Sequence, residues 1–526
     1  MRDPKALETR VFDVLVVGGG AMGAGVARDA ALRGLSVAVV EQDDFAEGTT
    51  SRSTRLIHGG LRYLAQREFG LVRENLRERE ILLRTAPHLV RPLPVYVPLY
   101  RPSVRERARM RAGMLLYDLL SRRKSLPRRS WVPRERLLAL EPGIAADGLR
   151  GAWRFYDAQC ALVERLVVEN VVDAKRSGAI ALNHAKAIRW LREGDAVVGA
   201  EVRDELSGRS IRVRASATVN ATGAWLDLTN RGIRRETRPA LRLTKGVHLV
   251  TPPATRHAFL HFHTDGRPIF VLPWLGSSLV GTTDTDFDGD PSDARASEAD
   301  VRYLVGAAAG IFAGAPLADV AYAYAGVRAL VNLGGVKADE VPREHEIRDH
   351  GETDGVAGIV SIVGGKLTAY RGIAQEAVDV VAKRLGNRAR CVTKTRPLPG
   401  AGASQDLREE GLELGLAADQ VDRLLSVYGS MTRDLLARIE GEPSLRLRVA
   451  PGSAATRVEV VHAIESEDAA TLPDVLLRRT CLGLARDRAL PLARAVAELG
   501  GFHGDEVDAY CAAVNAQQPI AVSVPA

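Results

Sequence analysis

Apolar and polar stretches alternate most clearly near the N-terminus of the chain. Residues 11–17 form an apolar, β-branched run of strand length, and residues 36–40 form a second apolar run. Between them lies an Ala-rich stretch that reaches about Arg33 and is followed by Gly34, a residue type that commonly ends a helix. The pattern predicts a strand, a helix and a second strand, which is the first unit of a parallel α/β sheet.

A glycine-rich turn joins the first predicted strand to the helix. The letters GGGAMG at positions 18–23 match the GxGxxG pattern, and Glu41 follows Gly18 by 41 − 18 = 23 residues. Glycines let the backbone approach a pyrophosphate, and the N-terminus of a helix carries a partial positive charge. Glu41 can accept hydrogen bonds from ribose hydroxyls. The turn therefore predicts a dinucleotide site.

Three later segments indicate which dinucleotide is bound. A small, hydroxyl-rich loop at residues 45–54 stands where a nicotinamide enzyme would continue through further βα units. An Ala-Thr-Gly turn at 221–223 ends a predicted strand, as flavoproteins often have near the adenosine half of their cofactor. Residues 359–368 predict a strand, a glycine pair and a helix start, whose dipole would stabilise a reduced flavin anion. Together they predict FAD.

The stretch 55–64 carries the clearest functional signal. The pair Gly59-Gly60 allows close approach to a large flat group, and His58, Arg62 and Tyr63 place polar groups beside it. We expect the flavin and an anionic substrate to lie here. The predicted cofactor-binding residues are Gly18, Gly20, Ala21, Met22, Gly23, Glu41, Thr50, Ser51, Arg55, Leu56, Ile57, His58, Gly60, Ala221, Thr222, Gly223, Gly365, Lys366, Leu367 and Thr368.

The remaining patterns divide the chain into parts. Residues 241–250, 257–262 and 269–273 are typical of strands in a mainly antiparallel sheet, and 297–313 of a helix. A Pro/Gly-rich linker at 397–402 precedes residues with helical apolar spacing. The predicted fold is α/β, a Rossmann-like FAD fold with two dinucleotide-binding-type domains, an antiparallel-sheet substrate domain and an all-helical C-terminal domain. The predicted boundaries are 8–95, 155–235 and 350–395 for a discontinuous FAD-binding domain, 96–154 for a basic helical insertion, 236–349 for the substrate domain and 400–526 for the C-terminal domain.

Composition narrows the class of protein. A chain of 526 residues is too long to fold around one hydrophobic core, so two or three domains are expected. Its four cysteines are scattered and form no CxxC pair, which argues against a zinc site or a disulfide framework. We expect no metal site and a reducing compartment. The apolar run 305–327 is interrupted by Pro316 and Asp319, which favours a buried helix and a strand over a membrane span. The first strand begins too early to leave room for a signal peptide, so we expect a cytoplasmic protein.

The net charge is +7, and although arginine is spread over the whole chain, one region is denser in positive charge. An apolar patch at 114–120 is surrounded by Arg101, Arg105, Arg107, Arg109, Arg111, Arg122, Arg123, Lys124, Arg128 and Arg129. A basic amphipathic segment of this kind can lie on an anionic membrane surface. The alternative is a solvated basic helix that packs its Leu face on the protein. No nucleic-acid-binding module accompanies the charge, so nucleic acid is not an expected partner.

These motifs resemble the FAD-dependent glycerol-3-phosphate dehydrogenases of the aerobic, respiratory type. The resemblance covers nearly the whole chain and rests on segments 18–23, 56–64, 245–248, 272–274, 281–284, 324–328, 364–371 and 471–480. Two positions depart from the family: Arg55 stands where lysine is common, and Ala329 where proline is usual. Neither change removes a functional group.

The resemblance implies that sn-glycerol 3-phosphate is oxidised to dihydroxyacetone phosphate, with hydride passing from C2 to flavin N5. Arg62, Arg328 and Arg343 are the expected phosphate ligands, because planar guanidinium groups suit a phosphate dianion. Tyr63 and Asp284 are expected on the substrate side. Asp284 would hold a loop or orient a catalytic group, and a plain turn carboxylate is the alternative.

The expected catalytic residues are His248, Arg328 and Lys366. His248 aligns with the active-site histidine of the family and is the first choice for the base that takes the C2 hydroxyl proton. His345 is the second choice. His58 is expected to contact the flavin through its backbone, and Lys366 to lie near the reacting centre.

Electrons must then leave the reduced flavin. No iron–sulfur or haem ligand set is visible in the sequence, so we expect a diffusible acceptor. The resemblance favours membrane quinone, with peripheral association on the cytoplasmic face of the inner membrane through the basic segment. Oxygen, which some relatives use, and assembly as a homodimer remain open.

Two other classes of protein fit the same pattern. A flavin amino-acid or 2-hydroxy-acid oxidase would need fewer cations, and the phosphate candidates and the C-terminal domain argue against it. A non-catalytic flavoprotein, RNA-binding or regulatory, would lack polar groups at the reacting face. His248, Arg328 and Lys366 are all present.

Overall fold

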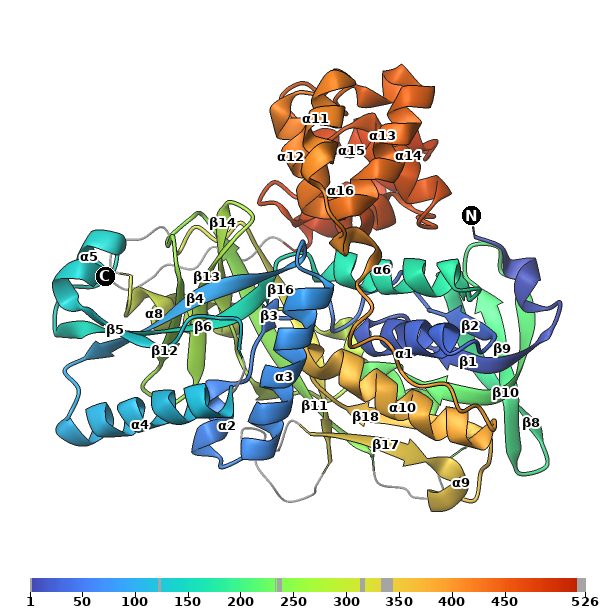
Figure 1. Cartoon of the computed structure of the whole chain (residues 1–526), viewed down its shortest axis with the longest axis horizontal. Helices are drawn as coiled ribbons and strands as arrows, with labels where there is room; N and C mark the ends of the chain where they lie inside the picture. Colours follow the sequence, from blue (N-terminus) through green and yellow to red (C-terminus); the bar gives the residue numbers. More distant parts are fainter. Residues whose placement is uncertain are drawn as a thin grey trace.

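The computed structural model describes residues 2–121, 124–231, 233, 239–312, 317–332 and 344–517, apart from the side chains of Arg62 and Ala65. Two β-sheets lie beside each other, and a lobe of helices stands on one side of them (Figure 1). This arrangement confirms the predicted α/β architecture, with a second, mainly antiparallel sheet and a helical C-terminal domain.

The first sheet is built on parallel strands. Its order is β17 (His345–Asp349), β18 (Ile359–Gly364), β10 (Ser210–Asn220), β1 (Val11–Val17), β2 (Val37–Val40) and β7 (Ile180–Leu182), with β9 (Ala196–Asp204) and β8 (Ala185–Glu193) added beyond β10. The strands from β18 to β7 pair in parallel, while β17, β9 and β8 pair antiparallel. The carboxyl ends of the parallel strands therefore meet at one edge, where ligands bind in such folds.

Alternation along β1 explains how both faces of this sheet are covered. Val14 and Val16 belong to the core cluster that contains α1, whereas Leu15 and Val17 pack with residues of β9 and β10 on the other face. Three helices share the first side: α1 (Ala21–Leu32), α6 (Val163–Arg176) and α10 (Tyr370–Arg384) (Figure 1).

The second sheet has ten strands. Its order is β15 (Thr285–Asp286), β11 (Leu241–Thr251), β14 (Ser277–Gly281), β13 (Pro268–Trp274), β12 (Ala258–Phe262), β4 (Val90–Tyr100), β6 (Leu149–Cys160) and β3 (Leu56–Ile57), with β16 (Tyr322–Val331) on β11 and β5 (Ser130–Pro133) on β6. All these pairs are antiparallel except β12 with β4. Helix α8 (Glu298–Ala309) packs against β11, β13 and β14.

Residues 96–154, predicted as a helical insertion, contain strands of this second sheet. The end of β4, all of β5 and the first half of β6 lie within them. The arginines and prolines hide the strand pattern. Pro92, Pro94 and Pro98 stand two and four positions apart along β4. Because alternate residues of a strand point their N–H groups to the same side, the positions that lack an N–H group all face one edge of β4. Strand β12 reaches that edge only at Val95 and Tyr96.

Helices α2 (Leu61–Ala65), α3 (Phe69–Thr85), α4 (Val104–Leu120) and α5 (Arg134–Leu140) lie between strands of the second sheet in the chain, and α7 (Leu226–Thr229) and α9 (His350–Thr353) are short. Of these, α4 runs along one edge of the molecule (Figure 1). Only Met114 and Tyr117 of its seventeen residues are buried.

The C-terminal lobe is helical throughout its described part. It comprises α11 (Gln405–Glu413), α12 (Ala418–Tyr428), α13 (Thr432–Gly441), α14 (Arg457–Glu465), α15 (Ala493–Gly500) and α16 (Gly504–Asn515). A π-helical segment, Asp474–Arg479, contacts α6 and pairs with Asp44 in the loop after β2. Among the described helices of the whole chain, none combines the length and apolar character needed to cross a membrane.

Candidate functional site

A cavity of about 1330 Å³ lies between the two sheets. Its wall is formed by the glycine turn, the loop after β2, the stretch after β3, and strands of the second sheet. Sites for small ligands commonly measure roughly 300–1,000 Å³, so this cavity has room for a dinucleotide and a small substrate. Of the predicted residues, the wall includes Gly18, Gly20, Ala21, Met22, Glu41, Thr50, Arg55, Leu56, His58, Gly60, Tyr63, Ala221, Thr222, Gly223, His248, Asp284, Arg328, Gly365, Lys366 and Leu367.

The glycine turn at one end of the cavity has no space for side chains. Gly18 has a φ of +106°, and a Cβ there would lie 2.6 Å from the carbonyl oxygen of Ala221. A Cβ on Gly23 would lie 1.8 Å from the carbonyl oxygen of Gly18. Gly23 is absent from the cavity wall, so it serves the packing of α1 on β1. Gly20 precedes α1 and lines the cavity, and the first amide of that helix, from Ala21, donates to Thr50 Oγ1 (3.2 Å).

Glu41 lies in the cavity wall just after β2. Its carboxylate accepts hydrogen bonds from the amides of Gly19 (2.5 Å) and Asp43 (3.1 Å). Burial raises the pKa of Glu41 to about 7, although the two amide hydrogen bonds act in the opposite direction. Carboxylate oxygens at this point are suited to a ligand that brings hydroxyl donors.

The other end of the cavity is held together by backbone contacts of His58. Its amide donates to Thr368 Oγ1 (3.1 Å), and its carbonyl accepts from Lys366 Nζ (2.9 Å). The same ammonium lies 5.1 Å from the centre of the Tyr63 ring. Thr368 is fully buried and is not part of the wall, so it supports the stretch after β3 from behind.

His248 on β11 is buried and faces the cavity. Its Nε2 lies 2.8 Å from Thr54 Oγ1, and its ring stacks on Tyr324 at 5.1 Å. Nδ1 is a buried nitrogen with no hydrogen-bond partner among the described residues. Burial and the positive charges of Arg328 and Arg55 hold the pKa of His248 well below its ordinary value. The imidazole is therefore neutral and able to accept a proton.

Arg328 on β16 is oriented by the loop that follows β14. Its guanidinium donates to Thr282 Oγ1 (2.8 Å), the carbonyl of Thr283 (3.1 Å) and Asp284 Oδ1 (3.2 Å). Gly246 on the neighbouring strand makes room for it, because a Cβ there would lie 2.1 Å from Nη2. Asp284 thus contacts a candidate catalytic group.

A comparison with known protein families follows the same division of the chain. Residues 13–379 match the model described as FAD dependent oxidoreductase, and residues 391–502 match the C-terminal domain of alpha-glycerophosphate oxidase. A curated relative from Synechocystis sp., "Glycerol-3-phosphate dehydrogenase", is 39% identical over 92% of this chain and 91% of its own. This chain belongs to the FAD-dependent glycerol-3-phosphate dehydrogenase family.

Solved structures agree with membership of that family. The glycerol-3-phosphate dehydrogenase from Bacillus halodurans complexed with FAD has a TM-score of 0.77 and 29% identity, and the match covers 97% of this chain and 95% of that one. A glycine oxidase from Geobacillus kaustophilus shares the fold alone, with a TM-score of 0.55 and 19% identity. That match covers 99% of the oxidase but 74% of this chain.

The cavity fits FAD, the cofactor of this family. Residues of the glycine turn line this cavity together with Glu41, whose carboxylate would accept from ribose hydroxyls, and together with Gly365 and Lys366. The Glu41 end would hold the adenosine half and the Lys366 end the flavin ring.

Some predicted residues are held by the protein itself or lie outside the cavity wall. Arg55 is buried, donates to both oxygens of Glu164 (2.7 Å each) and lies 4.5 Å from the Trp274 ring, so its guanidinium is held by the protein rather than by a ligand. Ser51 donates to carbonyls of its own loop. Ile57 is fully buried in β3. His345 bonds to Glu376 (2.8 Å) and is absent from the wall.

Two of the predicted phosphate ligands cannot be placed. Arg343 lies outside the described residues, and so does the side chain of Arg62, although its backbone belongs to α2. Arg328 is the candidate phosphate ligand whose geometry is known.

Sequence reasoning missed several residues of the site. Thr54 stands in the hydroxyl-rich loop, where its contact with His248 has no local signal. Asp157 on β6 lines the cavity and accepts hydrogen bonds from Arg79 (2.6 Å) and Tyr117 (2.8 Å). Phe270 on β13 meets the His58 ring edge to face at 6.2 Å. An acid or aromatic in a strand of a second sheet carries no motif that would identify it.

Proposed function

We propose that this chain oxidises sn-glycerol 3-phosphate to dihydroxyacetone phosphate. The observation that carries the proposal is the neutral, buried imidazole of His248 facing the same cavity as the oriented guanidinium of Arg328. The named relatives supply the substrate, and the cavity supplies a base and a fixed cation for it. When bound, FAD supplies the hydride acceptor.

His248 acts as the base in this proposal. It takes the proton of the C2 hydroxyl as the hydride leaves C2, and its low pKa keeps it unprotonated before the step. Thr54 and the stacked ring of Tyr324 hold the imidazole in one orientation. A base held this way is in position before the substrate arrives.

Arg328 binds the substrate anion, and Arg62 and Arg343 complete the phosphate site as the family pattern implies. The hydrogen bonds of Arg328 to Thr282 and Asp284 fix the plane of the guanidinium, whose positive charge attracts phosphate oxygens. Lys366 stands at the flavin end, close to Tyr63, where a positive charge stabilises negative charge that develops during the reaction.

We infer that quinone in a membrane accepts the electrons. Helix α4 supports this inference, because Val104, Leu115 and Leu119 are 74%, 45% and 52% exposed. At 3.6 residues per turn these three side chains fall within about 60° of one another. Exposed arginines of the basic segment flank them. Such a helix can rest on anionic lipid at the cytoplasmic face of the membrane.

Anaerobic bleaching of the flavin tests the substrate. Loss of the oxidised absorption band with glycerol 3-phosphate, but not with an amino acid or a 2-hydroxy acid, is the expected result. Bleaching only by the carboxylate substrates would contradict the phosphate assignment and identify an amino-acid or hydroxy-acid oxidase.

The acceptor is tested separately by turnover with a soluble quinone and with oxygen. Quinone turnover well above oxygen turnover is expected. The reverse would make the enzyme an oxidase that needs no membrane.

A further inference from the structure

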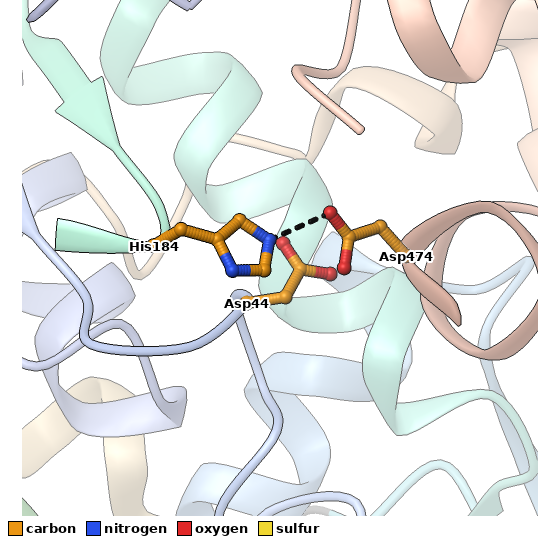
Figure 2. A group of neighbouring side chains, drawn as sticks. All are labelled: Asp44, His184 and Asp474. Atoms are coloured by element: carbon orange, nitrogen blue, oxygen red, sulfur yellow. Dashed lines mark hydrogen bonds and ion pairs between the residues drawn. The ribbon is translucent and has the colours of Figure 1, made fainter. Parts of the chain in front are cut away.

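Three side chains meet where the C-terminal lobe touches the first sheet (Figure 2). Asp44, His184 and Asp474 offer ligand atoms that all lie within 4.8 Å of one another. Asp44 and Asp474 are fully buried, and His184 Nε2 donates to Asp474 (2.8 Å). Two carboxylates and an imidazole are the ligand types of many metal sites, so the neighbours of these groups decide what the cluster does.

Guanidinium groups already occupy the carboxylates. Asp44 accepts from Arg479 Nη1 (2.6 Å) and Nη2 (2.8 Å), from Arg478 Nε (2.5 Å) and from Asn183 (2.8 Å). Asp474 accepts from Arg478 Nη2 (2.9 Å) as well as from His184. Two buried positive charges at these distances would repel a metal ion. The cluster is therefore a set of ion pairs between two parts of the chain.

One side of the cluster belongs to the cofactor cavity. Asp44 lies in residues 41–50, and six residues of this segment, including Glu41 and Thr50, form part of the cavity wall. His184 is also in the wall, and its amide donates to the carbonyl of Asp43 (2.5 Å). The amide of Ala185 donates to the carbonyl of Glu41 (2.6 Å). The Glu41 end of the cavity is thus bordered by two segments that are bonded to each other.

The other side of the cluster belongs to the C-terminal lobe. Asp474, Arg478 and Arg479 all come from the π-helical segment, and helical segments of this kind occur often at functional sites. Arg478 also pairs with Glu47, so two acids of residues 41–50 are held from the lobe. Breaking one partner of a buried ion pair leaves an uncompensated charge, which makes such contacts sensitive to loss.

We propose that the C-terminal lobe is a clamp for the adenosine half of FAD. Its two arginines hold residues 41–50, and its Asp474 holds His184, in the conformation that accepts the cofactor. The lobe then determines how tightly FAD is retained, without touching the reacting atoms. Asp474, Arg478 and Arg479 act as positioning residues through Asp44, Glu47 and His184.

The test is the dissociation constant of FAD for the full-length protein, measured by fluorescence titration of FAD into protein stripped of cofactor. Arg479→Met is expected to weaken FAD binding by about tenfold or more, because it removes two hydrogen bonds and one of the two positive charges that neutralise the buried Asp44 carboxylate. Asp44→Asn changes the same contact with almost no change in shape and is expected to weaken FAD binding in the same direction.

Arg176→Met is the matched control. Arg176 on α6 pairs with Asp434 of the lobe at 2.9 Å, yet neither residue contacts the cavity wall. It is expected to leave the FAD affinity unchanged. Limited proteolysis in the linker 397–402 reports whether the lobe stays docked in each variant.

Two results would overturn the clamp. One is an unchanged FAD affinity in Arg479→Met and Asp44→Asn with only a lowered melting temperature, which would make the cluster a source of stability alone. The other is an equal loss of FAD affinity in Arg176→Met, which would mean that docking in general, rather than this cluster, governs the cofactor. If Arg479→Met does not fold, Asp44→Asn and Arg479→Lys answer the same question.

Discussion

Burial and two neighbouring guanidiniums keep His248 neutral, and this state can be tested at the level of one side chain. We expect His248→Gln to slow anaerobic flavin reduction by glycerol 3-phosphate by about 10²–10⁴-fold, the range for loss of a general base. Stopped-flow absorbance measures the rate. Thr54→Val serves as the control, because it removes only the hydrogen bond to the ring and should slow reduction less.

The dependence of kcat/KM on pH, measured for the wild type and for His248→Gln, tests the same state of His248. Because the folded pKa of His248 is depressed, its basic form persists below the ordinary value of 6.5. We therefore expect no loss of kcat/KM attributable to His248 between neutrality and pH 6.5. An acidic limb centred above pH 6.5 that disappears in His248→Gln would contradict the depressed pKa.

Glu41 makes a prediction about stability. Its pKa rises from 4.5 when exposed to about 7 in the folded protein, so the folded state binds more protons between these values. The unfolding free energy of the FAD-free protein should fall as the pH rises from 4.5 to 7, by at most about 3 kcal/mol for this group. Denaturant unfolding of Glu41→Gln beside the wild type isolates the effect, because the variant lacks the group. If the unfolding free energies of the wild type and Glu41→Gln change with pH in the same way, the raised pKa of Glu41 is refuted.

Residues with local signals were the predictable ones. Gly18 and Glu41 are identified by spacing along the chain, and His248 by its resemblance to a family motif. Thr54 and His248 are 194 residues apart, and Arg55 is neutralised by Glu164 109 residues later. Such pairs depend on how the two sheets face each other, which no local pattern encodes.

At the level of elements, α4 is joined to the site through one side chain. Tyr117 Oη donates to Asp157 (2.8 Å) in the cavity wall and accepts from the amide of Gly59 (3.0 Å). We expect Tyr117→Phe to lower the unfolding free energy by about 1–3 kcal/mol, since two buried polar groups lose a partner, and to shift the flavin absorption band. Tyr303→Phe, which loses a bond to Asp265 between two residues that do not line the cavity, should leave the band unchanged. An unaltered band in Tyr117→Phe would refute the link.

The exposed side of α4 makes its own prediction. Replacing Leu115 and Leu119 by Ser should reduce co-sedimentation with vesicles containing anionic lipid, and added salt should reduce it further. Leu206→Ser, at a leucine that is 49% exposed in another part of the molecule, is the control and should bind vesicles like the wild type. Equal binding of all three proteins would exclude α4 as the membrane contact.

Elements were predicted where apolar periodicity was undisturbed, as in β1, α1 and the C-terminal helices. They were missed where charge or proline masked the period. The prolines of β4 and the arginines around β5 made residues 96–154 read as helix, although β4 and β6 pair along their whole length. The strand pattern is decided there by the partner strand rather than by the intrinsic preference of the segment.

For the whole molecule, the fold class followed from the order of the glycine turns along the chain. The separate lobe followed from the linker at 397–402 and the helical spacing after it. How the lobe contacts the first sheet could not be predicted, because Arg479 and Asp44 are 435 residues apart. Charged residues are usually solvated. Only the assembled structure brings Asp44, Asp474, Arg478 and Arg479 into contact in a buried site.

The separation of Asp44 and Arg479 along the sequence has a consequence for how the protein is synthesised. Asp44 leaves the ribosome among the first tenth of the chain, but the guanidiniums that neutralise it are synthesised near the end. A nascent chain can form the glycine turn early, yet its Asp44 carboxylate must stay in water until Arg478 and Arg479 arrive. Under the clamp proposed above, tight capture of FAD would then be a late event, and a chain truncated before residue 474 would be released with its cofactor bound weakly.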